Sequence, residues 1–352
     1  MKNRKENIYI NGRFLTQKIT GVQRYAIEVI KKLDKIMTNC NFIILTPKNR
    51  IIQNLELENI EIRNIGKFSG HLWEQISLPF YMLIHDRKAK LLNMCNLAPI
   101  LYPGYVVLHD IAFKTHPEHL DKKFSLWYKF VTRVNIKRYR HIFTVSNFSK
   151  NEIIKNYNIE PKKITVTYNS AEHLKQIKPD ESILERLMLY NKNFCFSLGS
   201  KSPHKNHKFI IECAKLNPNI IFVVSGNSNS KIFKNENENE HIDNLIYTGY
   251  ISDNELVALY KNCMAFIFPS LYEGFGIPPL EAMEAGCKCV ILSDIPVLKE
   301  IYNENAIYVD LNENGINLEK VLKQYNQKET KKLNEKYQWK NVTNIIIKEI
   351  GG

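Results

Sequence analysis

The sequence predicts an α/β protein made of two Rossmann-like parallel-sheet domains facing across a cleft. Short apolar runs alternate with helical patterns along the whole chain, as expected for β-α-β units. The chain has 352 residues, which is enough for two domains of ordinary size. A polar stretch from about residue 170 to 192, containing Pro179, interrupts the alternation, and we expect the hinge between the domains there.

The first domain is expected at residues 1–172. An apolar pattern at helical spacing predicts a helix that begins near Gly21 or Val22 and follows the first strand. Further helices are expected at 71–86 and 119–140. The expected strands are 7–11, 41–46, 60–65, 90–95, 105–110, 141–146 and 163–170.

The second domain is expected at residues 173–338 and repeats the same alternation. Its expected strands are 194–200, 220–225, 245–250, 265–269, 287–292 and 306–310. Its expected helices are 206–216, 253–262, 278–286 and 296–303. The remaining segment, 339–352, predicts a last helix from Trp339 to Ile350 with one apolar face.

The positive charge of the chain lies in its first half. The net charge is +13; up to residue 172 there are 28 Lys and Arg against 14 Asp and Glu, and 21 against 22 thereafter. This asymmetry suggests an anionic partner such as a membrane surface, an anionic lipid carrier or nucleic acid, although scattered lysines also solubilise a surface.

One segment of the first half, residues 121–141, predicts a basic amphipathic helix. Phe124, Trp127 and Tyr128 recur at a spacing of three to four and are expected to pack on the domain. The basic side chains opposite them offer a second interpretation, contact with anionic lipid headgroups.

Seven cysteines without a Cys-x-x-Cys pair favour a reducing compartment. Cys287 and Cys289 alternate on an expected strand, so we interpret them as buried thiols rather than a metal pair. No signal peptide or transmembrane segment is expected, which predicts a cytoplasmic protein, peripheral on the inner face of the membrane if the basic half binds lipid. The acidic segment 234–241 is interpreted as a solvated loop.

The nonapeptide EGFGIPPLE, residues 273–281, is the most informative motif. It follows an apolar strand, contains two glycines that permit close backbone approach, and places Pro278 in the first turn of a helix. Glu273 and Glu281 therefore flank a helix N-terminus at the edge where α/β sheets bind ligands. The simpler interpretation, a loop carboxylate and a dipole-complementing one, explains each glutamate alone but not the combination.

Three other positions suit a phosphorylated ligand. Gly21 lies where a helix begins, and backbone amides there hold phosphate. The turn GSKSPHKN places Lys201 and Lys205 before another helix, which suits a diphosphate. His109 ends an expected strand, although a lone histidine is more often structural. No Asp-x-Asp motif occurs, so no metal and no other cofactor is expected.

With these motifs in order, the chain resembles a retaining glycosyltransferase of the GT-B architecture, glycosyltransferase family four. The segment EGFGIPPLEAM resembles the family signature of two glutamates separated by seven residues. The segments GVQRYA, LHDIAF with HPEHL, VSNFSKNEI, SPHKN and SDIPVLKEI follow in the family's order. The resemblance extends over essentially the whole length and implies that the last helix crosses back onto the first domain.

The resemblance implies roles for residues of the second domain. Glu281 would hold the ribose hydroxyls of a nucleotide, and Glu273 would contact sugar hydroxyls near the anomeric carbon. Tyr250 and Ile251 fall where the family's main chain meets the base. The backbone facing the sugar and phosphates would come from Gly274, Phe275 and Gly276.

It also implies a phosphate clamp. Lys205 matches the lysine that neutralises the diphosphate, Gly21 a glycine whose amide meets a phosphate, and His109 a histidine beside the donor sugar. The family's arginine near the lysine is absent, and Lys201 stands close to its place without the bidentate geometry of arginine. We expect His109, Lys205 and Glu273 to be the catalytic residues.

The implied reaction is the metal-independent transfer of a hexosyl group from a nucleoside diphosphate sugar, with retention, to a glycan or lipid-linked glycan. Such a step belongs to the assembly of cell-surface polysaccharide, lipopolysaccharide O-antigen or capsule. A nucleotide-sugar epimerase or a phosphorylase of the same architecture is the alternative. A basic nucleic-acid binder is a further one, but the sequence has no helix-turn-helix, zinc or aromatic RNA-binding pattern, so no nucleic acid is expected.

Overall fold

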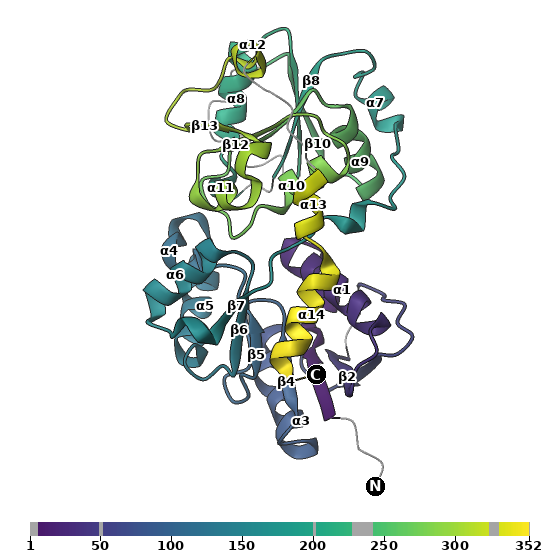
Figure 1. The fold of residues 1–352 in the computed structure, drawn as a ribbon, viewed down its shortest axis with the longest axis vertical. Coiled ribbons are helices and arrows are strands. Elements are labelled where there is room, and N and C mark those ends of the chain that lie inside the picture. Colours follow the sequence, from purple (N-terminus) through teal and green to yellow (C-terminus); the bar gives the residue numbers. More distant parts are fainter. Residues whose placement is uncertain (1–5, 49–51, 200–201, 227–241, 324–330, 352) are drawn as a thin grey trace. The chain divides into compact units, whose positions relative to one another are not determined.

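The computed structural model describes residues 6–48, 52–199, 202–226, 242–323 and 331–351. The chain forms two compact units (Figure 1). Unit 1 comprises residues 1–169 together with the C-terminal residues 338–352, and unit 2 comprises residues 170–337. The acidic segment 234–241 and Lys201 lie outside the described residues.

Unit 1 contains a seven-stranded parallel sheet in the order β3-β2-β1-β4-β5-β6-β7. Its strands are β1 Glu6–Asn11, β2 Cys40–Pro47, β3 Glu61–Ile65, β4 Lys90–Asn93, β5 Tyr105–Val107, β6 His141–Thr144 and β7 Ile164–Val166. Its helices are α1 Gly21–Lys35, α2 Gly70–Leu72, α3 Leu78–His85, α4 Ala112–Thr115, α5 Lys122–Asn135, α6 Asn147–Tyr157 and α14 Trp339–Ile350. One π-helical turn, Trp73–Ser77, joins α2 to α3, and short 3-10 turns lie at Gly12–Thr16, Pro117–His119 and Pro161–Lys163.

The last helix belongs to unit 1, as predicted. α14 begins at Trp339 and packs beside α1, as Figure 1 shows. Trp339 is fully buried and meets the ring of Tyr25 edge-on, with 5.6 Å between the centroids. Val342, Ile346 and Ile350 are also buried, so the apolar face read from the sequence is the packing face.

Unit 2 contains a six-stranded parallel sheet in the order β10-β9-β8-β11-β12-β13. Its strands are β8 Phe194–Leu198, β9 Ile221–Ser225, β10 Leu245–Gly249, β11 Ala265–Phe268, β12 Val290–Ser293 and β13 Ile307–Val309. Its helices are α7 Ser182–Arg186, α8 His207–Leu216, α9 Asp253–Asn262, α10 Ile277–Glu284, α11 Pro296–Tyr302, α12 Leu318–Lys323 and α13 Lys331–Lys336. Short 3-10 turns lie at Glu172–Leu174 (η5), Pro203–Lys205 (η6) and Asn303–Asn305.

Both sheets have the doubly wound order, so the predicted fold class of two Rossmann-like domains is confirmed. The order reverses between β1 and β4 in unit 1 and between β8 and β11 in unit 2. In such sheets ligands bind at these reversal points, beyond the carboxyl ends of the strands. Among the described residues, no helix is both long and apolar enough to cross a membrane.

Several details of the expected elements differ in the structure. β5 stops at Val107, so His109 lies in the loop beyond the strand. β12 begins at Val290, and the strand predicted from residue 287 was wrong there, although Cys287 and Cys289 are buried as expected. In α5 the buried face is centred on Tyr128 and Val131, and Phe124 is 40% exposed, so it lies at the margin of the predicted aromatic face. Its ring still stacks on Tyr128, with 3.9 Å between the centroids.

Candidate functional site

The reversal point of unit 2 brings Lys205 and Glu273 together. η6 follows β8 and ends at Lys205, and Glu273 follows β11, the strand next to β8. The backbone N–H of Leu271 donates to the carbonyl of His204 over 2.7 Å, which ties the two loops. The Lys205 Nζ donates to Glu273 Oε1, and the two side chains are only 17% and 13% exposed. Sequence reasoning placed both residues at this edge but did not predict their pairing.

The helix after the glycines begins as the motif predicted. Gly276 precedes α10 with φ 82° and ψ 68°, a left-handed conformation that favours glycine. A Cβ there would lie 2.7 Å from Leu298 Cδ2, so the position also lacks room for a side chain. The Tyr302 hydroxyl donates to the carbonyl of Gly276, which fixes the loop from the buried side.

Glu281 lies on α10 and is held by two side chains that the sequence did not single out. His173 Nε2 lies 3.0 Å from Glu281 Oε1, and the Tyr260 hydroxyl donates to Glu281 Oε2 over 3.3 Å. Tyr260 belongs to α9, whereas His173 lies in η5, more than one hundred residues before Glu281. Only the tertiary fold brings these three groups together.

The other predicted residues of unit 2 differ in exposure. Phe275 is buried and meets Tyr337 edge-on, with 5.5 Å between ring centroids. Its side chain therefore supports the loop, and its backbone is the part left for a ligand. Tyr250 is 87% exposed and Ile251 is buried, directly after β10. The ligand roles predicted for Gly274 and for these residues stay predictions.

In unit 1, Gly21 is the first residue of α1, as expected. Thr20 precedes it in extended conformation, and the Thr20 backbone N–H donates to Gln23 Oε1 over 3.1 Å. Gly21 is exposed. The N–H of a first helical residue has no acceptor within its own helix, so this amide suits an anionic ligand.

His109 is buried in unit 1. Its Nε2 lies 3.0 Å from the carbonyl of Met94, and its ring meets Tyr25 edge-on at 4.9 Å between centroids. Burial lowers the pKa of His109 to about 4, against the opposing effect of the Met94 hydrogen bond. The ring is therefore neutral at pH 7, with Nε2–H as donor and Nδ1 as acceptor. The neighbouring Asp110 accepts the backbone N–H of Ala112, so it closes the turn before α4.

The reversal point of unit 1 contains a buried polar cluster that sequence reasoning missed. Asn11 Nδ2 donates to Glu74 Oε1 and to Asn93 Oδ1, each over 3.0 Å, and Arg13 Nε donates to Glu74 Oε1 over 3.1 Å. Burial alone would raise the pKa of Glu74, but the charge of Arg13 and the hydrogen bonds outweigh it and lower the pKa. A signal was present, because β1 and β4 both end in asparagine after apolar residues.

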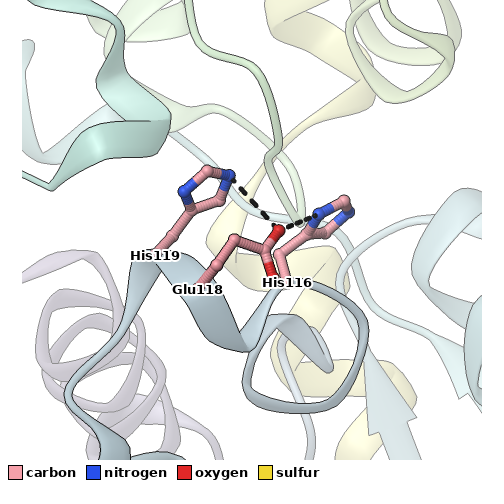
Figure 2. Close-up of side chains that lie close together, drawn as sticks. All are labelled: His116, Glu118 and His119. Atoms are coloured by element: carbon pink, nitrogen blue, oxygen red, sulfur yellow. Dashed lines mark hydrogen bonds and ion pairs between the residues drawn. The ribbon is translucent and has the colours of Figure 1, made fainter.

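The HPEH segment of unit 1 forms a compact charged turn, shown in Figure 2. Glu118 Oε1 lies 3.3 Å from His116 Nδ1 and 3.8 Å from His119 Nε2. A hydrogen bond from the Glu118 backbone N–H, the bond from His116 and the nearby imidazoles lower the pKa of Glu118. Among the described residues this is a group of possible metal ligands, with the three atoms within 4.8 Å of one another, but Glu118 is largely exposed. The prediction of a metal-free reaction stays a prediction.

Comparison with known proteins agrees with this geometry. Two doubly wound units, with a cation and two carboxylates near the reversal point of unit 2, are the arrangement expected of a GT-B protein. Residues 181–339 match the family model described as glycosyl transferases group 1. That segment is nearly all of unit 2 and contains EGFGIPPLE, so the match agrees with the resemblance drawn from that motif.

Two relatives act in O-antigen synthesis. The chain is 33% identical over 217 residues to the O-antigen chain mannosyltransferase RfbU of Salmonella typhimurium, covering 60% of this chain and 58% of the relative. It is 25% identical over 328 residues to O-antigen chain mannosyltransferase B of Escherichia coli, covering 84% of each. The match thus spans little more than half of the first relative and most of the second.

Solved structures share the fold over nearly the full length. Sucrose-phosphate synthase of Thermosynechococcus elongatus superposes with a TM-score of 0.70 at 14% identity and 98% coverage of both chains. Anabaena HepE in complex with UDP-glucose superposes with a TM-score of 0.66 at 15% identity, covering 98% of this chain and 95% of HepE. At such identities the likeness establishes the GT-B fold alone.

Proposed function

We propose that the protein is a retaining hexosyltransferase that uses a nucleoside diphosphate sugar to glycosylate a hydroxyl of a glycan or lipid-linked glycan. The observation that carries the proposal is the Lys205–Glu273 pair at the reversal point of unit 2. Glu281 lies about one turn inside α10, which begins at Ile277 shortly after Glu273. The two relatives named above support it, since both are O-antigen chain mannosyltransferases.

The pair suggests how the donor is received. A diphosphate carries more negative charge than one carboxylate, so it competes with Glu273 for the Lys205 ammonium. Once Lys205 turns to the diphosphate, Glu273 is released to accept hydrogen bonds from sugar hydroxyls. As the anomeric bond breaks, negative charge grows on the diphosphate, and Lys205 with the positive N-terminal end of the α10 dipole stabilises it.

Unit 1 by itself offers two further groups that suit a phosphorylated sugar. Gly21 offers a helix-start amide to a phosphate, and His109 is assigned to the sugar. Since the buried His109 ring is neutral, its Nδ1 accepts a hydrogen bond from a sugar hydroxyl and it does not act as a general acid. A pKa of about 4 also makes this ring a weak general base. The proton of the attacking hydroxyl then has to leave to another base, and the departing phosphate itself meets that need.

The proposed pathway is the assembly of a cell-surface polysaccharide, with lipopolysaccharide O-antigen or capsule as candidates. The two O-antigen chain mannosyltransferases that the chain resembles support this placement, and mannose is the first donor sugar to test. Another relative, of Escherichia coli, is named a galactosyltransferase acting on a diphosphoundecaprenol-linked sugar, which supports a lipid-linked acceptor.

The direct test is nucleotide release from nucleoside diphosphate sugars, with Glu281→Ala and Lys205→Ala as variants. Losing a hydrogen bond or ion pair to a charged ligand costs about 1.5–3 kcal/mol, so each variant should raise the donor KM roughly 10- to 100-fold. Glu284→Ala, one turn further along α10, and Lys208→Ala, exposed on α8, are the matched controls. If both site variants are folded, as judged by circular dichroism, and their donor KM is unchanged, the assignment of Lys205 and Glu281 to the donor site is wrong.

We further propose that unit 1 binds the cytoplasmic face of an anionic membrane. Four side chains spaced by four residues form an exposed apolar strip along the helical stretch Gly70–His85: Leu72, Ile76, Phe80 and Ile84. α5 adds exposed Leu126 and Phe130 together with its lysines. Apolar insertion plus basic attraction is the usual basis of peripheral binding. The seven free cysteines are consistent with the cytoplasmic side.

Vesicle co-sedimentation tests the membrane proposal. Binding to phosphatidylglycerol vesicles should exceed binding to phosphatidylcholine vesicles, fall as salt rises, and weaken when Lys122, Lys123 and Lys129 are changed to Gln. Changing three exposed lysines of unit 2 to Gln makes the same charge change and serves as the control: Lys261, Lys288 and Lys320. Equal binding to neutral and anionic vesicles contradicts the proposal.

We also propose that transfer needs no divalent metal, because Lys205 and helix N-termini supply the positive charge. Treatment with EDTA should then leave the rate of nucleotide release unchanged. A loss reversed by one added metal overturns this proposal, and the turn drawn in Figure 2 becomes the first set of residues to mutate.

A further inference from the structure

The two side chains that hold Glu281 have no role in the function proposed above. We infer that His173 and Tyr260 are positioning residues that fix the Glu281 carboxylate for a ribose diol. This inference rests on the proposed function, which supplies the nucleotide. Three largely buried residues, one each from η5, α9 and α10, would then together recognise the two hydroxyls of the ribose.

Because the three side chains are largely buried, the Glu281 carboxylate has few acceptor positions left for a ligand. The side chains of His173 and Glu281 are 4% and 12% exposed, and Tyr260 is fully buried. A carboxylate removed from water needs hydrogen-bond donors, and here each oxygen receives one. An ionised carboxylate has about four acceptor positions, two on each oxygen. One position on each oxygen therefore stays open, which matches two adjacent hydroxyl donors.

The histidine and the glutamate orient each other. The Nε2–H of His173 points at Glu281 Oε1, whereas Nδ1 is buried and has no hydrogen-bond partner among the described residues. Among the described residues, the hydrogen bond to Glu281 is therefore the one that orients the His173 ring. Removing it frees both the imidazole and one edge of the carboxylate.

The segment that carries His173 has a second contact with α10. Lys175 Nζ lies 3.7 Å from Glu284 Oε1, with the lysine side chain 46% exposed. Such half-exposed pairs contribute little, whereas a short bond to a buried carboxylate contributes more. η5 begins three residues after unit 1 ends at Asn169, so the donor-site carboxylate is held by the start of unit 2. Lys175 provides a matched control on the same segment.

The inference is tested by isothermal titration calorimetry on the full chain. UDP, GDP and ADP are titrated first, and the nucleotide that binds most tightly is then compared with its 2′-deoxy form. His173→Ala should weaken binding of the ribose form roughly 10-fold or more, the loss of a charge-assisted hydrogen bond. His173→Gln keeps an amide N–H near the Nε2 position and should recover most of that loss. Lys175→Ala should bind like the wild type.

The deoxy ligand separates positioning from general damage. If His173 acts through Glu281 on the ribose, His173→Ala lowers the preference for the ribose form over the 2′-deoxy form. A merely structural effect weakens both equally and leaves the preference unchanged, which overturns the inference. The double variant His173→Ala/Glu281→Ala should bind the nucleotide almost as well as Glu281→Ala alone, because His173 acts through Glu281.

The outcomes distinguish this inference from the proposed function. Wild-type affinity in His173→Ala beside weak binding in Glu281→Ala overturns the inference and leaves the function standing. Wild-type affinity in Glu281→Ala, or no binding of any of the three nucleotides to the wild type, overturns the proposed donor site and the inference with it. If His173→Ala does not fold, Tyr260→Phe, which removes one oxygen, is expected to weaken the ribose form several-fold, and unchanged affinity there is contrary evidence.

Discussion

The buried His109 predicts a specific loss of stability in acid. Its pKa falls from an ordinary 6.5 to about 4 because burial disfavours the imidazolium. Between those values the unfolded chain takes up a proton that the folded chain does not, so stability falls as the pH is lowered through that window. The full difference of 2.5 units, from 6.5 to 4, corresponds to about 3 kcal/mol, of which about 2 kcal/mol is lost by about pH 5.

The perturbation is His109→Gln. Glutamine does not titrate, and its amide N–H can donate to the Met94 carbonyl in place of Nε2. Relative to the wild type, His109→Gln should therefore lose about 2 kcal/mol less stability between about pH 7.5 and about pH 5. His85→Gln, at an exposed position of α3, should follow the wild type.

The assay is denaturant unfolding followed by tryptophan fluorescence. The three tryptophans are Trp73, Trp127 and Trp339, and all belong to unit 1, so the signal reports the unit that contains His109. Carboxylates also titrate in acid, but their contribution to the loss of stability is the same in His109→Gln and in the wild type. It therefore cancels when the two pH dependences are compared. Equal losses for His109→Gln and the wild type refute the reasoning, because the ring would then be protonated in the folded protein as readily as in the unfolded one.

The remaining predictions concern one buried charge and one glycine. Glu74→Gln leaves the guanidinium of Arg13 buried without a counter-charge and should cost unit 1 roughly 3 kcal/mol, measured by the same fluorescence assay; a loss near zero contradicts the buried pair. Gly276→Ala should lower the melting temperature more than Gly286→Ala. Both have positive φ, but only at Gly276 would the new Cβ meet a buried side chain, that of Leu298 at 2.7 Å, and equal melting temperatures contradict this contact.

Much of the fold followed from local pattern. Apolar runs and helical periodicity placed the strands of both sheets and most of the longer helices within a few residues, because burial against a parallel sheet imposes these patterns directly. The eleven-residue helix α6 and the short helices α4, α7, α12 and α13 were not predicted. The ends of elements were less predictable. β5 stops at Val107 although the apolar run continues to Leu108, since a strand ends where its neighbour stops pairing with it and not where hydrophobicity stops.

The candidate site divides in the same way. The motif from Glu273 to Glu281 carried its own evidence, because glycines, prolines and carboxylates within nine residues define a helix entrance regardless of the remaining chain. The sequence by itself therefore determined the strands that make up the two sheets, the helix start at Gly21 and the edge that carries Lys205. These features depend on neighbours within a turn or a strand.

Tertiary structure alone decided which side chains meet. His173 reaches Glu281 across 108 positions, and Asn11 reaches Glu74 across 63, through contacts that no local spacing encodes. Burial likewise decided that His109 is neutral, because a pKa depends on the solvent and charges that surround a group and not on its place in the chain. Long-range packing, set when the strands pair, is the physical reason for both.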